Sequence, residues 1–304
     1  MPDATRVTKR RAAQVPGARR RRSGMLQCMR IEFTKMHGLG NDFIIFDALP
    51  GAPLPSAAQW RQLADRHTGI GFDQALVLEP ARARDAAVFY RIFNADGGEV
   101  EQCGNGARCV ASLLHQRHAG NGELLTMDST GGRLQARILA NGLVSVNMGI
   151  PDFNPASLPF LAATPALSYE LAVEGETIRF GAVSMGNPHA VIHVQNIESA
   201  PVERLGRALQ ASASFPRQVN VGFMQVLDAG HLRLRVYERG AGETLACGTG
   251  TCAAVAVARS LGLVGPEVEV HVRGGRLGVH WEGPGHALWL TGPAETAFVG
   301  QVEI

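Results

Sequence analysis

Two cysteines stand out because each opens the same pattern, Cys-Gly-x-Gly, which is followed by an apolar run. Cys103 begins Cys-Gly-Asn-Gly, and Cys247 begins Cys-Gly-Thr-Gly 144 residues further along the chain. The apolar runs predict helices over residues 107–116 and 252–261, with the cysteine motif at each helix N-terminus. Such an end offers unpaired backbone N–H groups and a partial positive charge. We therefore expect the pKa of each thiol to fall below its usual value of about 8.5, and the neighbouring N–H groups to suit a carboxylate.

Two such motifs facing one substrate fit the transfer of an α-proton of an amino acid. The carbanion that develops needs hydrogen-bond donors aimed at the carboxylate. A thiolate on one face removes the proton and a thiol on the other face returns one, which inverts the centre. A pyridoxal phosphate enzyme needs a Schiff-base lysine, but the chain has only Lys9 and Lys35, and nothing around Lys35 suggests a phosphate site. We predict a reaction without a cofactor.

The cysteine spacing disfavours two other uses of these thiols. Cys109 and Cys252 follow the two motifs at spacings of six and five residues, which do not fit a zinc knuckle, so no metal site is predicted. Neither Cys103 nor Cys247 belongs to a Cys-x-x-Cys motif, which leaves a thiol-redox or binding protein as a less favoured rival. Cys109 and Cys252 are expected to be small buried packing residues.

The segment around the first motif is repeated around the second. Residues 91–106 and 235–250 align without a gap, with six identities in sixteen positions. The identical pairs are Arg91/Arg235, Gly98/Gly242, Glu99/Glu243, Cys103/Cys247, Gly104/Gly248 and Gly106/Gly250. An internal duplication of this kind predicts two similar lobes, related by a pseudo-two-fold axis.

Short β-like runs surround both predicted helices. They cover residues 43–47, 75–78, 87–93, 143–148, 189–194, 223–227, 232–237, 268–272 and 287–290. The predicted fold is α+β, with two similar strand-rich lobes, each wrapped around a central helix. We assign residues 30–148 to the N-terminal lobe and 149–292 to the C-terminal lobe. Residues 293–304 could pair back with either lobe, including a return to the N-terminal one.

The positive charge of the chain is concentrated at its beginning. Nine of its 29 lysines and arginines lie within residues 1–30, against one acid, Asp3. We interpret residues 1–29 as a basic disordered extension. Without this segment the remaining chain is acidic, and no apolar run approaches the roughly 20 residues of a membrane span, so neither nucleic acid nor a membrane is the expected partner. Five cysteines without an export signal favour a reducing, cytoplasmic location.

Six motifs resemble those of the diaminopimelate epimerase family, and the resemblance covers about residues 30–304. They are Met36-His-Gly-Leu-Gly-Asn-Asp-Phe43, Gly71-Phe-Asp-Gln74, Asn94-Ala-Asp-Gly97, Cys103-Gly-Asn-Gly-Ala-Arg-Cys109, Gly186-Asn-Pro-His189 and Glu238-Arg-Gly-Ala-Gly-Glu-Thr-Leu-Ala-Cys-Gly-Thr-Gly250. The resemblance implies interconversion of LL- and meso-2,6-diaminoheptanedioate by two cysteines, without a cofactor, in lysine and cell-wall precursor synthesis.

The resemblance also implies a role for each site residue. Cys103 and Cys247 would be the catalytic pair, and His189 and Glu238 would tune their pKa values. The implied substrate-binding residues are Asn41, Gln74, Asn94, Gly104, Asn105, Asn187, Asn220, Glu238, Arg239, Gly248 and Thr249. Homodimers are implied, with Phe298 at the dimer contact. The nearest rival is another two-cysteine racemase, of the proline or hydroxyproline type, which would need no arginine such as Arg239 for a distal carboxylate.

Overall fold

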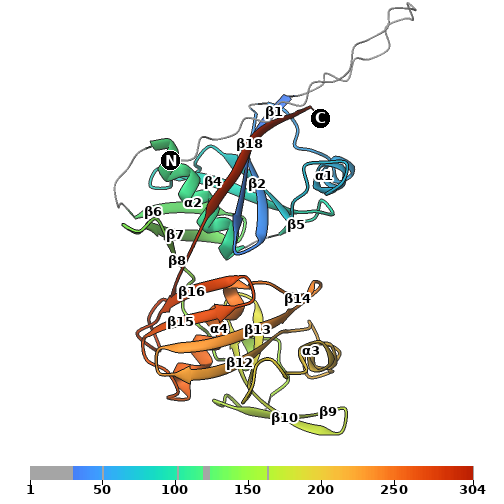
Figure 1. Cartoon of the computed structure of the whole chain (residues 1–304), viewed down its shortest axis with the longest axis vertical. Coiled ribbons are helices and arrows are strands. Elements are labelled where there is room, and N and C mark those ends of the chain that lie inside the picture. The colour runs from blue at the N-terminus through green and yellow to red at the C-terminus, as the bar shows by residue number, and fades with distance from the viewer. Residues whose placement is uncertain (1–29, 50, 101–102, 119–123, 163, 304) are drawn as a thin grey trace, which may run out of the picture.

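The chain forms two lobes of similar construction, one above the other in Figure 1. The computed structural model describes residues 30–49, 51–100, 103–118, 124–162 and 164–303. The predicted basic extension, residues 1–29, lies outside the described residues. Among the described residues, no helix combines the length and the apolar character that a membrane crossing requires.

The N-terminal lobe contains two helices and eight strands within the described residues. These are β1 (Arg30–Gly38), β2 (Asn41–Asp47), α1 (Ala57–Ala64), β3 (Gln74–Glu79), β4 (Val88–Asn94), β5 (Glu99–Val100), α2 (Gly104–His118), β6 (Leu125–Ser129), β7 (Gly132–Ile138) and β8 (Val144–Asn147). The capping box of α1, in which Ser56 and Gln59 exchange hydrogen bonds, satisfies the first N–H groups of that helix.

The C-terminal lobe repeats this order of elements. It comprises η1 (Pro155–Ser157), β9 (Tyr169–Val173), β10 (Glu176–Ser184), β11 (Pro188–His193), α3 (Val202–Gln210), β12 (Asn220–Asp228), β13 (His231–Glu238), β14 (Gly242–Thr244), α4 (Gly248–Ser260), β15 (Glu267–Val272), β16 (Gly275–His280) and β17 (Trp289–Gly292). All nine predicted strands and both central helices are present at the predicted positions, within a few residues.

The strand pairings of the two lobes follow the same sequence of directions. In the N-terminal lobe, β1–β2 and β3–β4 are antiparallel, whereas β2–β3 and β4–β6 are parallel. In the C-terminal lobe, β10–β11 and β12–β13 are antiparallel, whereas β11–β12 and β13–β15 are parallel. Strands β8 and β17 pair with each other and join the two lobes. The predicted fold class, two repeated strand-rich lobes, is therefore confirmed.

After β17 the chain returns to the N-terminal lobe and ends in the last strand, β18 (Glu295–Glu303), which lies beside β1 (Figure 1). It pairs antiparallel with β1, so residues 295–303 extend the N-terminal sheet. In the C-terminal lobe, β9 occupies the matching position beside β10. The chain therefore passes through the junction between the lobes a second time, directly after β17.

Each lobe has its own core around a central helix. The residues of α4 from Gly250 to Ala258 are all buried, and four of them are alanines, which lets strands approach the helix on several sides. Cys109 and Cys252 are completely buried among these cores, which confirms their predicted packing role. Both helices begin earlier than the apolar runs indicated, at Gly104 and Gly248, directly after the two motif cysteines.

Candidate active site

Both motif cysteines lie at the N-termini of the central helices, in the same local geometry. Cys247 is the N-cap of α4, and its sulfur accepts a hydrogen bond of 3.4 Å from the backbone N–H of Gly250. Cys103 directly precedes α2, and its sulfur accepts a bond of 3.4 Å from the N–H of Gly106. The duplicated Cys-Gly-x-Gly motif therefore places each sulfur over the first turn of its helix, where backbone donors are unpaired.

The two helix ends approach each other at the junction between the lobes. A methyl group added at Gly248 would lie 3.9 Å from the Cα atom of Gly104 and 3.2 Å from a methyl carbon of Leu290. One added at Gly104 would lie 3.1 Å from the terminal carbon of Met148. Glycine at both positions thus allows the close approach, and the N–H groups of both helices meet in one region.

Burial dominates the acidity of the two thiols. It raises the pKa of Cys103 to about 11, and the hydrogen bond from Gly106 and the charge of Arg108 offset this only in part. It raises the pKa of Cys247 well above the usual value, in spite of the hydrogen bond from Gly250. The expectation of lowered pKa values is therefore wrong, because burial away from water destabilises a thiolate by more than the helix N-terminus stabilises it.

Glu238, at the end of β13, acts on both sulfur atoms. Its carboxylate hydrogen-bonds with Cys247, and its negative charge raises the pKa of Cys247 and of Cys103. The hydroxyl of Thr244 donates to the same carboxylate. Cys103 and Cys247 come from different lobes, yet they share this charged neighbour.

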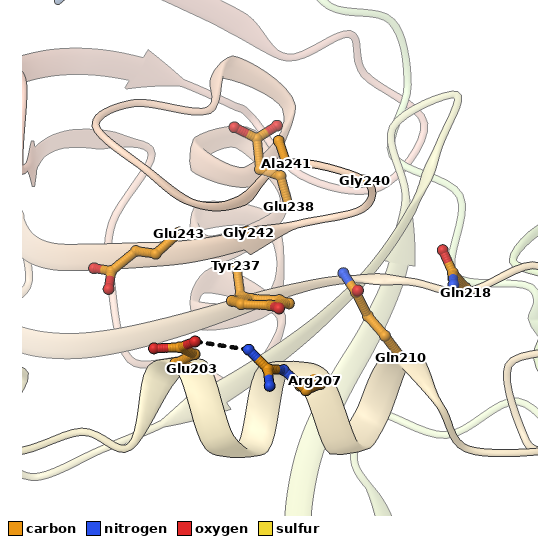
Figure 2. A pocket seen from close by; sticks show the side chains of 10 residues that line it. All are labelled: Glu203, Arg207, Gln210, Gln218, Tyr237, Glu238, Gly240, Ala241, Gly242 and Glu243. Carbon is orange, nitrogen blue, oxygen red and sulfur yellow. Dashed lines mark hydrogen bonds and ion pairs between the residues drawn. The ribbon is translucent and has the colours of Figure 1, made fainter.

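Glu238 also borders a cavity beside helix α3. The cavity has a volume of about 610 Å³ and is lined by Glu203, Arg207 and Gln210 of α3 and by residues of the β13–β14 hairpin. Figure 2 shows the Glu238 carboxylate pointing away from α3, with the Tyr237 ring between them. Tyr237 packs against Gly206 of α3, where an added methyl group would lie 2.4 Å from the ring, so α3 supports the hairpin beside the cavity.

His189 reaches the second thiol only through other side chains. It is fully buried, and burial together with the charge of Arg239 lowers its pKa to about 3, so the ring is neutral at pH 7. Its Nε2 atom lies 3.0 Å from Oδ1 of Asn187, and Nδ2 of Asn187 donates to the hydroxyl of Thr249 at 3.3 Å. That hydroxyl lies 3.6 Å from the sulfur of Cys247.

The polar residues predicted in the N-terminal lobe lie at strand ends near Cys103. Asn41 begins β2, and its Oδ1 lies 3.9 Å from the Cys103 sulfur and accepts from Nδ2 of Asn105 at 3.2 Å. Gln74 and Asn94 are directly opposite on β3 and β4, and Gln74 Nε2 donates to Asn94 Oδ1 at 2.8 Å. The buried Oε1 of Gln74 has no partner among the described residues, which leaves an acceptor suited to an ammonium group.

In the C-terminal lobe, Asn220 holds the turn that carries Arg239. Asn220 is buried at the start of β12, donates to the Pro188 carbonyl at 3.2 Å and accepts from the backbone N–H of Arg239 at 2.9 Å. The Arg239 side chain is exposed, and its Nη1 donates to the Arg217 carbonyl at 3.1 Å. No carboxylate of the described residues pairs with this guanidinium, so it retains donors for an anionic ligand.

Two residues of this region were not among the predicted site residues. Asp73 accepts from Nδ2 of Asn41 at 2.9 Å, and Arg108 donates to Oδ1 of Asn105 at 2.9 Å. Arg108 is completely buried, although it lies in an apolar helix. A charged residue within the apolar run was the signal that could have identified it.

Phe298, predicted at a dimer contact, is half-buried on β18 and packs edge-to-face on Phe33 with ring centres 6.0 Å apart.

Comparison with known proteins adds two close relatives. A family model described as diaminopimelate epimerase matches residues 33–154 and 181–297. The diaminopimelate epimerase of Alkalilimnicola ehrlichii is 52% identical over 279 residues, which are 91% of this chain and 100% of that protein. The enzyme of the same name from an Azoarcus species is 49% identical over 276 residues, with the same coverage.

Solved structures share the fold at much lower identity. A hydroxyproline epimerase from Agrobacterium vitis aligns with a TM-score of 0.66 at 18% identity, covering 90% of this chain and 93% of that one. An epimerase predicted in Pseudomonas aeruginosa aligns with a TM-score of 0.62 at 19% identity, covering 90% and 99%. These structures support the two-lobed fold, whereas the family model and the close relatives decide the family. The chain belongs to the diaminopimelate epimerase family.

Proposed function

We propose that this chain is an isomerase that interconverts LL- and meso-2,6-diaminoheptanedioate without a cofactor. Relatives of that name at 52% and 49% identity support the reaction. The observation that carries the proposal is the meeting of two cysteine-capped helix ends from different lobes, with Glu238 acting on both sulfurs. The rival of the proline or hydroxyproline type is supported only by folds at 18% identity.

In the proposed reaction, Cys103 and Cys247 flank the α-carbon. The thiolate of one removes the α-proton, so that a C–H bond breaks, an S–H bond forms, and the electron pair moves into the carboxylate. The thiol of the other then gives its proton to the opposite face of the carbon. The centre is inverted and the two sulfurs have exchanged protonation states, which allows the reverse reaction by the same groups.

Backbone N–H groups at both helix ends would hold the carboxylate that accumulates charge. These belong to Gly104, Asn105, Gly248 and Thr249, and two helix dipoles would act in the same direction. This matters because burial disfavours the thiolate form of both cysteines. Substrate that fills the site brings an ammonium group close to the sulfurs, and we infer that it offsets the cost of forming the thiolate.

The distal end of the substrate would select which α-carbon reacts. Arg239 has donors for the distal carboxylate, and a guanidinium binds a carboxylate with two parallel hydrogen bonds. Glu238 would accept from an ammonium group, and the free Oε1 of Gln74 offers a second acceptor. Asn94, Asn187 and Asn220 are neutral, so they can bind polar groups without adding a further charge near the thiols.

The proposed activity can be tested with purified protein and reductant but no added cofactor. LL-2,6-diaminoheptanedioate should be converted to the meso isomer, followed by chiral chromatography. Proline and trans-4-hydroxyproline, tested in parallel, should remain unchanged. Racemisation of either imino acid, together with inert diaminoheptanedioate, would overturn the assignment in favour of the rival class.

Two further features of the proposal concern assembly and compartment. Strand β18 pairs with β1 on one edge and with no other described strand, and Phe298 and the 41% exposed Val299 lie on it. We infer a homodimer formed across this edge, and Phe298→Glu should shift the mass measured by light scattering from dimer to monomer. Cys103 and Cys247 must both be reduced to react, so we infer a cytoplasmic location.

A further inference from the structure

Arg108 is a buried cation without a carboxylate partner among the described residues. It lies on α2, five residues after Cys103, and its side chain is completely buried. Its Nη2 donates to Oδ1 of Asn105 at 2.9 Å and its Nε to the Pro293 carbonyl at 3.3 Å, while Nη1 has no partner among the described residues. A guanidinium does not lose its proton in a protein, so this charge is permanent and largely desolvated.

Two glycines make room for this side chain at the junction of the lobes. A methyl group at Gly38, the end of β1, would lie 3.1 Å from Nη2 of Arg108. One at Gly292, the end of β17, would lie 3.2 Å from Nε. Neither glycine has a positive φ, so space rather than backbone conformation requires glycine there. The guanidinium therefore occupies a built recess where three chain segments meet.

Arg108 also begins a hydrogen-bond chain that leads to the first thiol. The chain runs from Arg108 to Asn105, from Nδ2 of Asn105 to Oδ1 of Asn41 at 3.2 Å, and from Nδ2 of Asn41 to Asp73 at 2.9 Å. A guanidinium can only donate and a carboxylate can only accept, so the two ends fix the direction of the chain. Both amide groups are therefore locked, and Oδ1 of Asn41 faces the Cys103 sulfur at 3.9 Å.

The duplication shows that this feature exists in one lobe only. The residue that matches Arg108 in the second Cys-Gly-x-Gly motif is Cys252, and the residue that matches Asn105 is Thr249. The ionisable groups that act on Arg108 are Cys109 of α2, Cys103 directly before α2, and Cys252 of α4. Arg108 in turn favours the thiolate of Cys103, against burial and the charge of Glu238, and it is not among the groups that act on Cys247.

We propose that Arg108 is a positioning residue of the reaction, which orients Asn105 and Asn41 at the first thiol and holds an uncompensated positive charge in the lobe of Cys103 that the matching residue of the other lobe, Cys252, does not supply. The expected change in kcat rests on the proposed function. The expected change in the reactivity of the Cys103 thiol does not depend on it. The charge of Arg108 stabilises the Cys103 thiolate, and the hydrogen-bond chain directs the Asn41 amide toward the same sulfur. The two effects predict different responses to substitution.

The test compares Arg108→Met, Arg108→Lys and a matched control, Arg117→Met. Arg117 lies on the same helix but is exposed and pairs with Asp47 on the surface. The first readout needs no substrate: the rate of iodoacetamide alkylation of Cys103 and of Cys247, followed by peptide mass spectrometry from pH 7 to 10. Thermal unfolding of each variant verifies folding, and kcat and KM for the LL isomer form the second readout.

Arg108→Met should slow alkylation of Cys103 about tenfold at pH 8, which corresponds to a shift of one pKa unit. Alkylation of Cys247 should change less than twofold. Arg108→Lys keeps the positive charge but loses the planar guanidinium that donates to Asn105 and to the Pro293 carbonyl. Alkylation of Cys103 should therefore stay within about threefold of the rate in the original chain, while kcat should fall by a larger factor than KM changes. Arg117→Met should alter none of these values.

The proposal is overturned if folded Arg108→Met alkylates Cys103 at the original rate, or if both cysteines slow equally, since either result would indicate a packing role alone. If Arg108→Met does not fold, the same judgement rests on Arg108→Lys: unchanged kcat in that variant would contradict the positioning role. Failure of the original chain to epimerise the LL isomer would refute the proposed function. The alkylation rates would still decide whether Arg108 acts on Cys103, because that measurement needs no substrate.

Discussion

The N-termini of α2 and α4 have the same local backbone geometry but differ in the charged groups around them. Each sulfur accepts from the N–H three residues ahead, at the same distance of 3.4 Å. The charge of Glu238 acts on both sulfurs, but its carboxylate hydrogen-bonds only with Cys247, which also contacts Thr249. Cys103 has Asn41 and the buried cation Arg108 as neighbours instead. A duplicated scaffold therefore supplies equivalent positions, and a few substitutions beside it make the two thiols chemically unequal. Unequal thiols suit a reaction in which one begins as base and the other as acid.

The largest effect is expected when either member of the pair is removed. Cys103→Ala and Cys247→Ala should each lower turnover of the LL isomer by at least about a thousandfold, because a missing acid or base leaves one face of the α-carbon without a proton carrier. The control is Cys109→Ala, which alters a buried packing residue of α2. Normal turnover in either of these variants would contradict the proposal that Cys103 and Cys247 act as a catalytic pair.

Oxidation should abolish activity reversibly if the sulfurs face a common substrate. Treatment with diamide should inactivate the original chain through a bond between Cys103 and Cys247, and dithiothreitol should restore activity fully. Mass spectrometry of unreduced peptides identifies the bond. Inactivation without a linked peptide, or full activity after oxidation, would argue that the sulfurs are held apart.

The pH dependence tests the cost of burying the thiolates. Because the pKa of Cys103 is raised to about 11, the thiolate fraction grows as the pH rises. We expect kcat/KM, which reports ionisations of the free enzyme, to increase from pH 7 to 8.5 by up to about tenfold per unit. A flat or falling profile over this range would contradict the raised thiol pKa.

A smaller effect with opposite signs is expected at Glu238. Glu238→Gln removes the negative charge that raises both thiol pKa values, so alkylation of Cys247 by iodoacetamide should become severalfold faster. Turnover should nevertheless fall, by about tenfold, because an acceptor for the substrate ammonium is weakened. If alkylation slowed, Glu238 would act by ordering the site rather than by its charge.

The two-lobed fold and the paired cysteines could be predicted because the duplicated segments 91–106 and 235–250 are visible in the sequence. The positions of nine strands followed from apolar runs, and the two helix N-termini followed from the repeated Cys-Gly-x-Gly motif. The strands outside the predicted runs are β1, β5, β6, β7, β9, β10, β14, β16 and β18. For residues 293–304 only a possible return to either lobe was predicted, because the partner of β18 is β1, at the other end of the described chain.

The acidity of the thiols was predicted with the wrong sign for a related reason. The helix N-terminus is visible in the local pattern, but the burial that outweighs it arises only when two lobes close over Cys103 and Cys247. Arg108 was missed although an arginine within an apolar run is visible in the sequence, because the sequence does not show which groups surround its side chain. Its role depends on Gly38, Gly292 and Pro293, which the fold brings together from distant segments.

The labelling pattern of the first turnovers in deuterium oxide tests the two-cysteine reaction most directly. The enzyme is incubated with LL-2,6-diaminoheptanedioate in deuterium oxide with reductant, and both isomers are separated and analysed by NMR and mass spectrometry within the first few per cent of conversion. Two bases on opposite faces predict a meso product that carries one deuterium at the inverted carbon, with the remaining substrate unlabelled. A product that keeps the original proton would indicate a single base serving both faces, and would contradict the account.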